Sequence, residues 1–177
     1  QTLAIGKIFH GRDARFFQQY GGTNGGFGPR PERKLSQPHG HPLWDWGAFP
    51  ESDGQMPDMI AAKWAVQKLQ RNFSSPFFMA IGFYRPHVPM FAPQKWFDRH
   101  PRNHLALPQV LVDDRSDLSQ YAIDLTNLNH VSPTHEWMTE AKQWRHAVQS
   151  YLASCTFVDH CVGMVLDALE AGPHRDN

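Results

Sequence analysis

The chain has 177 residues, in which 17 lysine and arginine residues balance 17 aspartate and glutamate residues, and 41% of the residues are hydrophobic. A formal net charge of zero argues against a protein that binds nucleic acid by neutralising phosphates. No stretch approaches the ~18 consecutive apolar residues of a membrane span, and the first residues lack the basic and apolar regions of a signal peptide. We therefore expect no nucleic-acid partner and no membrane span in this chain; the oligomeric state stays open.

The first half of the chain predicts a strand, a long loop, a helix and a second strand. Apolar residues 3–5 predict a short strand that runs into polar loop residues. Residues 21–50, rich in glycine, proline and tryptophan, predict a loop long enough to suggest that it binds or covers something. Pro57 predicts the start of a helix that reaches about Arg71. The apolar run 76–84 then predicts a strand buried on both faces, as in a parallel sheet covered by helices.

The second half predicts one dominant helix. Residues 85–134 indicate mostly irregular structure with a short helix near 93–99. Residues 137–171 predict a long amphipathic helical stretch that allows one break and stops at Gly172–Pro173. Its apolar stripe comprises Trp137, Ala141, Trp144, Val148, Tyr151, Cys155, Val158, Val162, Val165 and Leu169. The whole pattern predicts an α/β fold with a mostly parallel sheet flanked by helices.

Two cysteines, Cys155 and Cys161, lie six residues apart within this helical stretch. At ~100° per residue their side chains point in different directions, so we expect no disulfide between them. Cys155 falls on the apolar stripe and Cys161 falls beside it. This spacing predicts that Cys155 packs in the core and that Cys161 lies near the surface or a neighbouring element.

Cationic and imidazole side chains follow both predicted strands. Lys7 and His10 come after the first strand, and Arg85 and His87 come after the second. In an open parallel sheet, ligands bind in the crevice beyond the carboxyl ends of the strands, so these groups suit an anionic ligand. The alternative is that they are solvated loop charges.

Other candidate residues have two interpretations each. Trp44 and Trp46 in the long loop suit stacking on a sugar ring at a pocket rim, and they suit anchoring of the loop in the core equally well. The pair Asp113–Asp114 is interpreted as ordinary, because carboxylate pairs in loops are usually solvated, and His39–His41 is interpreted as loop residues, because no third ligand lies nearby in sequence. We therefore predict no metal site within this chain.

Several segments, spread in order over nearly the whole chain, together resemble the type I sulfatases and, more narrowly, the subgroup similar to iduronate-2-sulfatase. The segments are 6–10 (Gly-Lys-Ile-Phe-His), 44–47 (Trp-Asp-Trp-Gly), 83–90 (Phe-Tyr-Arg-Pro-His-Val-Pro-Met), 151–154 (Tyr-Leu-Ala-Ser), 157–159 (Phe-Val-Asp) and Gly163. The resemblance implies an alkaline-phosphatase-like α/β sandwich that hydrolyses sulfate esters, with a formylglycine nucleophile beside a calcium ion.

Carried over residue by residue, the resemblance implies that Lys7 contacts the formylglycine and the sulfate, and that His10 orients or deprotonates the formylglycine hydrate. His87 is implied to bind sulfate or to assist the leaving group. Arg85 is assigned to substrate binding with a solvent-directed side chain as the alternative, because many relatives have lysine before Pro-His and either residue suits both directions.

The family's nucleophile motif, Cys or Ser followed by any residue, Pro, any residue and Arg, does not occur in this chain. The calcium-binding aspartate pairs of the family also lack a match in the right order. We therefore interpret 1–177 as an internal part of one sulfatase catalytic domain, a partial sandwich incomplete at both ends, with the formylglycine and the calcium ligands outside this chain. Alone it is expected to be inactive.

The expected substrate is a sulfated small molecule or glycan, and the resemblance favours a periplasmic or secreted protein. Two alternatives stay open. A phosphonate or phosphate-ester hydrolase of the same superfamily would use comparable groups around a tetrahedral anion, and a non-catalytic module would merely bind sulfated glycan through Lys7, Arg85 and the tryptophan loop.

Overall fold

The computed structural model describes residues 1–10, 15–23, 25–36, 40–128 and 130–176. Strands β1 (Thr2–Gly6), β2 (Gln19–Tyr20) and β4 (Phe78–Gly82) form a parallel sheet in the order β2-β1-β4. Strands β3 (Trp46–Ala48) and β5 (Met90–Ala92) form a second parallel pair. All these pairings are parallel, which confirms the predicted α/β class.

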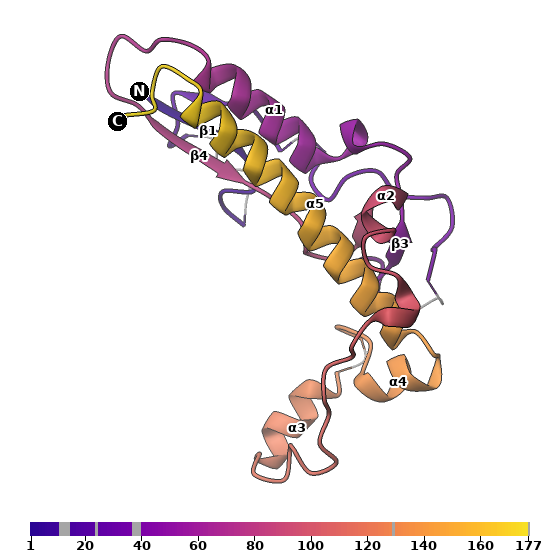
Figure 1. Cartoon of the computed structure of the whole chain (residues 1–177). Helices are drawn as coiled ribbons and strands as arrows, with labels where there is room; N and C mark the ends of the chain where they lie inside the picture. Colours follow the sequence, from indigo (N-terminus) through magenta and orange to yellow (C-terminus); the bar gives the residue numbers. More distant parts are fainter. Residues whose placement is uncertain (11–14, 24, 37–39, 129, 177) are drawn as a thin grey trace.

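Helices cover the strands on one side. Figure 1 shows α1 and α5 running alongside β1 and β4, whereas the segment that carries α3 projects away from this body. The helical elements are η1 (Asp53–Gln55), α1 (Pro57–Leu69), α2 (Gln94–Phe97), η2 (Arg102–His104), α3 (Gln120–Thr126), α4 (His135–Glu140) and α5 (Trp144–Glu170).

The predicted boundaries are close to the observed ones. Helix α1 begins at the predicted proline and ends two residues before Arg71, and α2 occupies the predicted short helix near 93–99. The 137–171 stretch contains most of α4, which begins two residues earlier at His135, then one break and the 27-residue α5. The 21–50 loop ends earlier than expected, because residues 46–48 form β3 against β5.

Strand β4 differs from its prediction in burial. We expected both faces to be covered, but Phe78 is 61% exposed and the other β4 residues are only partly buried. The reason is that β4 pairs with β1 on one side and forms the edge of the described three-stranded sheet. By contrast, Leu3, Ala4 and Ile5 of the central strand β1 are buried.

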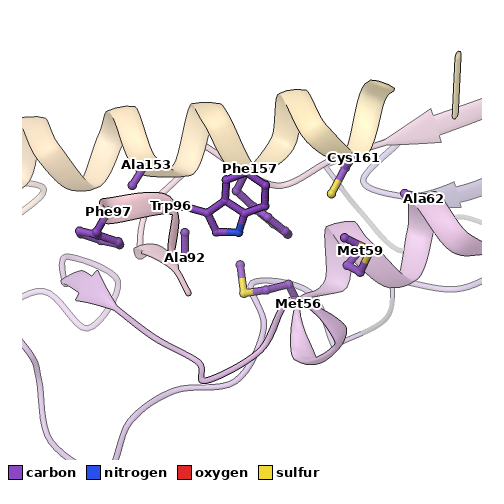
Figure 2. Packing of buried hydrophobic residues seen from close by; sticks show 9 residues of the cluster. All are labelled: Met56, Met59, Ala62, Ala92, Trp96, Phe97, Ala153, Phe157 and Cys161. Carbon is purple, nitrogen blue, oxygen red and sulfur yellow. The ribbon is translucent and has the colours of Figure 1, made fainter. Parts of the chain in front are cut away.

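The principal core lies between α1, α2, β5 and α5. Figure 2 shows Phe157 and Cys161 of α5 pointing towards the α2 residue Trp96 and the α1 residues Met59 and Ala62. The Trp96 and Phe157 ring centroids are 5.9 Å apart. Burying aromatic side chains of this size contributes a large share of the stabilisation of a small core.

The packing face of α5 corrects the prediction for Cys155, whereas Cys161 packs against a neighbouring element, one of its two predicted positions. Cys161 is completely buried, whereas Cys155 is only half-buried, and Tyr151 on the predicted stripe is 48% exposed. The neighbouring face contains the small residues Ala153 and Ser154, both fully buried, which allow α5 to approach its neighbours closely. The predicted absence of a disulfide is confirmed, because both cysteines are free.

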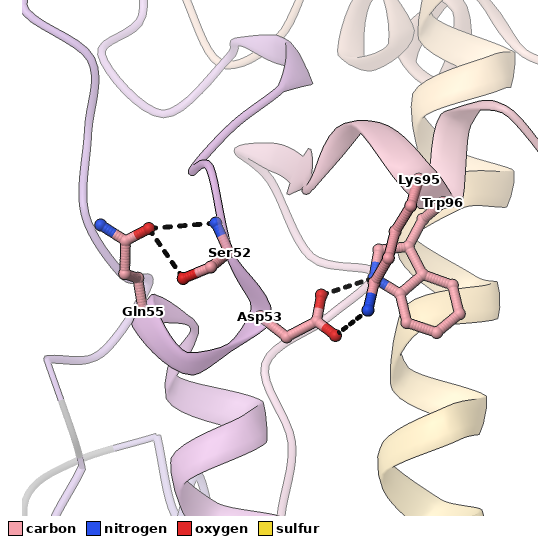
Figure 3. Close-up of polar contacts among 5 residues, drawn as sticks. All are labelled: Ser52, Asp53, Gln55, Lys95 and Trp96. Atoms are coloured by element: carbon pink, nitrogen blue, oxygen red, sulfur yellow. Dashed lines mark hydrogen bonds and ion pairs between the residues drawn. The ribbon is translucent and has the colours of Figure 1, made fainter.

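Polar contacts fix the start of α1. Both the backbone N–H and the hydroxyl of Ser52 donate to Gln55 Oε1, and the neighbouring Asp53 accepts a 2.8 Å hydrogen bond from Trp96 Nε1 and pairs with Lys95 (Figure 3). The turn before α1 is thereby tied to α2. Pro57 then occupies the first turn of α1, where its missing N–H costs no helical hydrogen bond.

Helix α5 has the length and apolar composition of a membrane-crossing helix, and among the described helices it alone has both. One such helix is weak support for a membrane span, because core helices of soluble proteins meet the same criteria. One face of α5 packs against α1, α2 and β5 through the core shown in Figure 2. The absence of a membrane span therefore stays a prediction.

Candidate functional site

The carboxyl ends of β1 and β4 approach each other closely at two glycines. Gly6 has a φ of 80°, and a Cβ atom there would lie 2.0 Å from the carbonyl oxygen of Gly82. A Cβ atom on Gly82 would in turn lie 2.1 Å from the carbonyl oxygen of Lys7, and Lys7 N donates to Gly82 O at 2.9 Å. Only glycine fits at both positions, and the close contact fixes where Lys7 leaves the sheet.

A cavity of about 470 Å³ opens at this edge. Lys7 and His10 line it together with a glycine-rich wall and three aromatic residues. The described lining residues are Gly6, Lys7, Phe9, His10, Thr23, Gly25, Gly26, Phe27 and Tyr84. Because they include one permanent cation and no carboxylate, the cavity suits an anion.

Lys7 and His10 are therefore brought together, as the sequence predicts for residues at strand ends. Lys7 is partly buried, and its ammonium group has no hydrogen bond or ion pair with any described residue. His10 is exposed at the cavity. A partly desolvated ammonium without a counter-charge attracts a bound anion more strongly than a fully hydrated one.

His87 lies next to this cavity, across the Phe27 ring. The centroids of the two rings are 4.9 Å apart, and Phe27 also packs edge-on against Tyr84 at 5.6 Å. His87 Nδ1 is 2.7 Å from the carbonyl oxygen of Val88. A carbonyl oxygen only accepts hydrogen bonds, so Nδ1 carries a proton and Nε2 is the nitrogen left for a ligand.

Arg85 is buried, with only 4% of its surface exposed, and does not line the cavity. Its guanidinium donates from Nε to the carbonyl oxygen of Phe91 at 2.8 Å and from Nη2 to that of Phe27 at 3.1 Å. In this structure it contacts main-chain oxygens of the site wall, so the sequence-derived role in substrate binding stays a prediction without a supporting contact.

Asp58 of α1 is the buried counter-charge of Arg85. Its carboxylate accepts hydrogen bonds from the backbone N–H groups of Tyr84 at 2.6 Å and Arg85 at 3.2 Å. Burial raises the pKa of Asp58, and these N–H groups and the Arg85 charge oppose the rise. Burial also lowers the pKa of Arg85 to about 10, so the guanidinium stays protonated at neutral pH.

The two tryptophans lie away from this cavity. Trp46 is fully buried in a cluster with Met90 and Ala147, which corrects its assignment as a sugar-stacking residue. Trp44 packs against the same cluster and donates from Nε1 to the carbonyl oxygen of Val131 at 3.0 Å. Anchoring of the loop, the alternative weighed from the sequence, is what the structure shows for Trp46.

Among the described residues, no group of three or more histidine, cysteine, aspartate or glutamate side chains converges as metal ligands would. Asp113 and Asp114 lie exposed in a turn. His39 lies outside the described residues, and His41 Nδ1 accepts a hydrogen bond from Leu43 N. The described residues thus do not fit a calcium site.

Sequence reasoning missed the aromatic and glycine-rich wall of the cavity. Phe27 and Thr23 belong to the 21–50 loop, for which only a general binding or covering role was predicted. The glycine run 21–26 was the available signal, because Gly22 O accepts from Gly6 N at 2.9 Å and so ties this loop to the end of β1. Asp58 was not among the candidate residues taken from the sequence.

Comparison with known proteins links these features to one family. The sulfatase family model matches residues 6–177. A protein named sulfatase from Formosa agariphila is 38% identical over 99% of this chain and 37% of its own length. Human iduronate 2-sulfatase is 29% identical over 67% of this chain and 23% of its own length. An arylsulfatase from Clostridium perfringens is 30% identical over 56% of this chain and 20% of its own length. The chain thus spans between 20% and 37% of these relatives.

Proposed function

This chain belongs to the sulfatase family, and from that premise we propose that the protein hydrolyses sulfate esters, with the cavity at the ends of β1 and β4 as the anion-binding side of its active site. The observation that carries the proposal is the convergence of Lys7 and His10 in a cavity whose described lining has no carboxylate. His87 lies beside it across the Phe27 ring.

The three residues have separable tasks in this proposal. The Lys7 ammonium neutralises sulfate oxygens, and the stabilisation grows as the ester bond breaks and negative charge develops. His10 orients the nucleophile or accepts its proton. His87, with Nδ1 held by the Val88 carbonyl, presents Nε2 to a sulfate oxygen or to the leaving alkoxide, which it protonates when the imidazole is cationic.

We further propose that the nucleophile, a formylglycine, and a calcium ion are supplied by segments outside residues 1–177. The support is that the described residues hold no metal-ligand cluster, while the two cysteines of this chain lie on α5 rather than in the cavity. The hydrated aldehyde supplies the attacking oxygen when that group is present.

The proposed substrate class is a sulfated small molecule or carbohydrate, and the proposed location is the periplasm or the cell exterior. The likeness to iduronate 2-sulfatase supports the carbohydrate substrate, and the location is proposed from the family resemblance alone. Both points are tested together by incubating separate cell fractions with a partially digested sulfated glycan and measuring the inorganic sulfate that each fraction releases from it.

The test of the activity uses the full-length protein with 4-nitrophenyl sulfate and 4-nitrophenyl phosphate. We expect hydrolysis of the sulfate ester in preference to the phosphate ester. Lys7→Ala is expected to lower kcat/KM by about 10²–10³-fold, as for removal of other groups that stabilise transition-state charge. The matched control is Lys63→Ala, because Lys63 is exposed on α1 away from the cavity.

Each outcome has a defined meaning. Preference for the phosphate ester would favour a phosphate-ester hydrolase that uses the same anion site over a sulfatase. Binding of sulfated glycan without turnover by a full-length protein that lacks the nucleophile motif would favour the non-catalytic module. Equal activity of Lys7→Ala and the control would remove Lys7 from the site.

A further inference from the structure

Arg85 contacts three segments of the chain, two of them distant in sequence. Its backbone N–H and that of Tyr84 donate to Asp58 at the start of α1, its Nε donates to Phe91 O within β5, and its Nη2 donates to Phe27 O in the glycine-rich loop. Arg85 thus connects the loop wall of the cavity to the core elements α1 and β5 by hydrogen bonds.

The Phe27 carbonyl is the part of the loop that Arg85 holds, and the Phe27 ring is the part that the site uses. The ring lines the cavity with Lys7 and His10 and packs at 4.9 Å against the His87 ring. The next residue, Gly28, has a φ of 90°, and a Cβ atom there would meet the Pro57 ring at 3.0 Å. The loop therefore runs close to the start of α1 at this point.

We propose that Arg85 is a positioning residue, which fixes the Phe27 segment by its guanidinium fork and thereby holds the His87 imidazole at the edge of the cavity. The proposal rests on the function proposed above for His87. It assigns Arg85 a role different from the direct substrate contact that the sequence suggests.

The burial of Arg85 supports positioning rather than contact with substrate. Two of its guanidinium nitrogens donate to main-chain oxygens, and the third, Nη1, is buried and has no partner among the described residues. Solvent does not reach this nitrogen, so an anion in the cavity does not reach it either. Lysine lacks the planar fork that serves both carbonyl oxygens at once.

The first experiment measures amide hydrogen exchange of the 25–31 segment in the full-length protein. Arg85→Met is expected to raise the exchange rate there by about tenfold, because the loop loses its connection to the core. Arg85→Lys keeps a cation beside Asp58 and is the variant to rely on if Arg85→Met fails to fold. Arg175→Met, at an exposed arginine, is the matched control and is expected to leave the segment unchanged.

The second experiment separates positioning from anion binding by kinetics. Arg85→Lys is expected to lower kcat for 4-nitrophenyl sulfate by about tenfold while the inhibition constant of inorganic sulfate changes by less than about twofold. A parallel loss of sulfate affinity and kcat would overturn the proposal in favour of direct contact.

A double-mutant cycle with Phe27→Leu tests whether Arg85 acts on His87 through Phe27. If Arg85 acts through Phe27, the double variant Phe27→Leu/Arg85→Lys is expected to be no slower than Phe27→Leu alone. Independent, multiplicative losses would overturn the proposal, as would unchanged exchange at 25–31. A wild-type protein that hydrolyses no sulfate ester would refute the proposed function instead, and the exchange result would still decide whether Arg85 holds the segment.

Discussion

At the scale of single residues, His146 gives a pH dependence that the structure specifies. Its ordinary pKa of 6.5 falls to about 4, because burial disfavours the charged ring and the nearby Arg102 repels it, while Asp45 partly opposes both effects. The unfolded chain therefore takes up a proton at a higher pH than the folded chain does. The stability linked to this group is complete above pH 6.5 and is lost as the pH falls towards 4.

We expect the free energy of unfolding of the full-length protein to fall by on the order of 2 kcal/mol between pH 6.5 and 4 because of His146. Urea unfolding at a series of pH values measures it. His146→Gln is expected to flatten the profile between pH 6.5 and 4. His104→Gln is the matched control, because His104 is exposed. A profile that keeps its slope in His146→Gln would contradict the assignment.

The candidate site shows how far residue patterns reach. Lys7 and His10 were found from their place after the first strand, because parallel strands end at one edge of a sheet. Phe27 was not found, because its role depends on where a glycine-rich loop folds back, and such a loop has no periodicity that sequence reasoning can use. Arg85 was recognised as a charge near the site, but its burial follows only from the packing of α1 and β5 around it.

At the scale of elements, the type and length of the regular segments could be predicted, but the orientation of α5 could not. The predicted stripe through Tyr151 and Cys155 is regular, yet the buried face runs through Ala153, Ser154 and Phe157. A hydrophobic pattern favours the larger apolar side chains, whereas close helix packing favours small ones. Alanine and serine contribute little to a hydrophobic pattern, so the sequence did not indicate the face of α5 that packs most closely.

That close packing leads to a prediction about Ser154. Its hydroxyl is buried against the core and has no hydrogen-bond partner among the described residues. Removing an unsatisfied buried hydroxyl is expected to stabilise the protein by about 1 kcal/mol, because the folded state no longer bears its desolvation cost. Thermal and urea unfolding of Ser154→Ala in the full-length protein measure the change.

Phe157→Ala provides the contrast on the same face of α5. The fully buried Phe157 ring packs on Trp96, and its truncation is expected to lower the free energy of unfolding by about 3–5 kcal/mol. Destabilisation of Ser154→Ala would instead show that the hydroxyl bonds to a group outside the described residues.

At the scale of the whole molecule, the order of short motifs along the chain identified the family, since no single motif is specific enough. The same scale explains the partial burial of β4 and α5. Val162 and Leu166 on the outer face of α5 are 38% and 52% exposed, and β4 has an unpaired edge in the described sheet. The relatives are much longer than this chain, which is consistent with further segments covering these surfaces in a complete sulfatase.

We therefore expect the isolated 1–177 polypeptide to aggregate or to form a partly molten state, because open strand edges and contiguous apolar surface favour association. Light scattering coupled to size exclusion, with near-ultraviolet circular dichroism during heating, distinguishes the outcomes. A soluble monomer with a sharp cooperative melt would show that the segment is a self-sufficient domain.

The double variant Val162→Lys/Leu166→Lys tests whether the exposed face of α5 causes the aggregation of the isolated polypeptide. In the isolated polypeptide it is expected to reduce aggregation, because two charges interrupt the exposed face of α5 without entering the core of Phe157 and Cys161. In the full-length protein it is expected to lower stability if further segments pack on this face, because the lysines must then be desolvated. A full-length protein that tolerates both lysines would show that this face of α5 is exposed in the complete molecule, and aggregation of the isolated chain would then arise from β4.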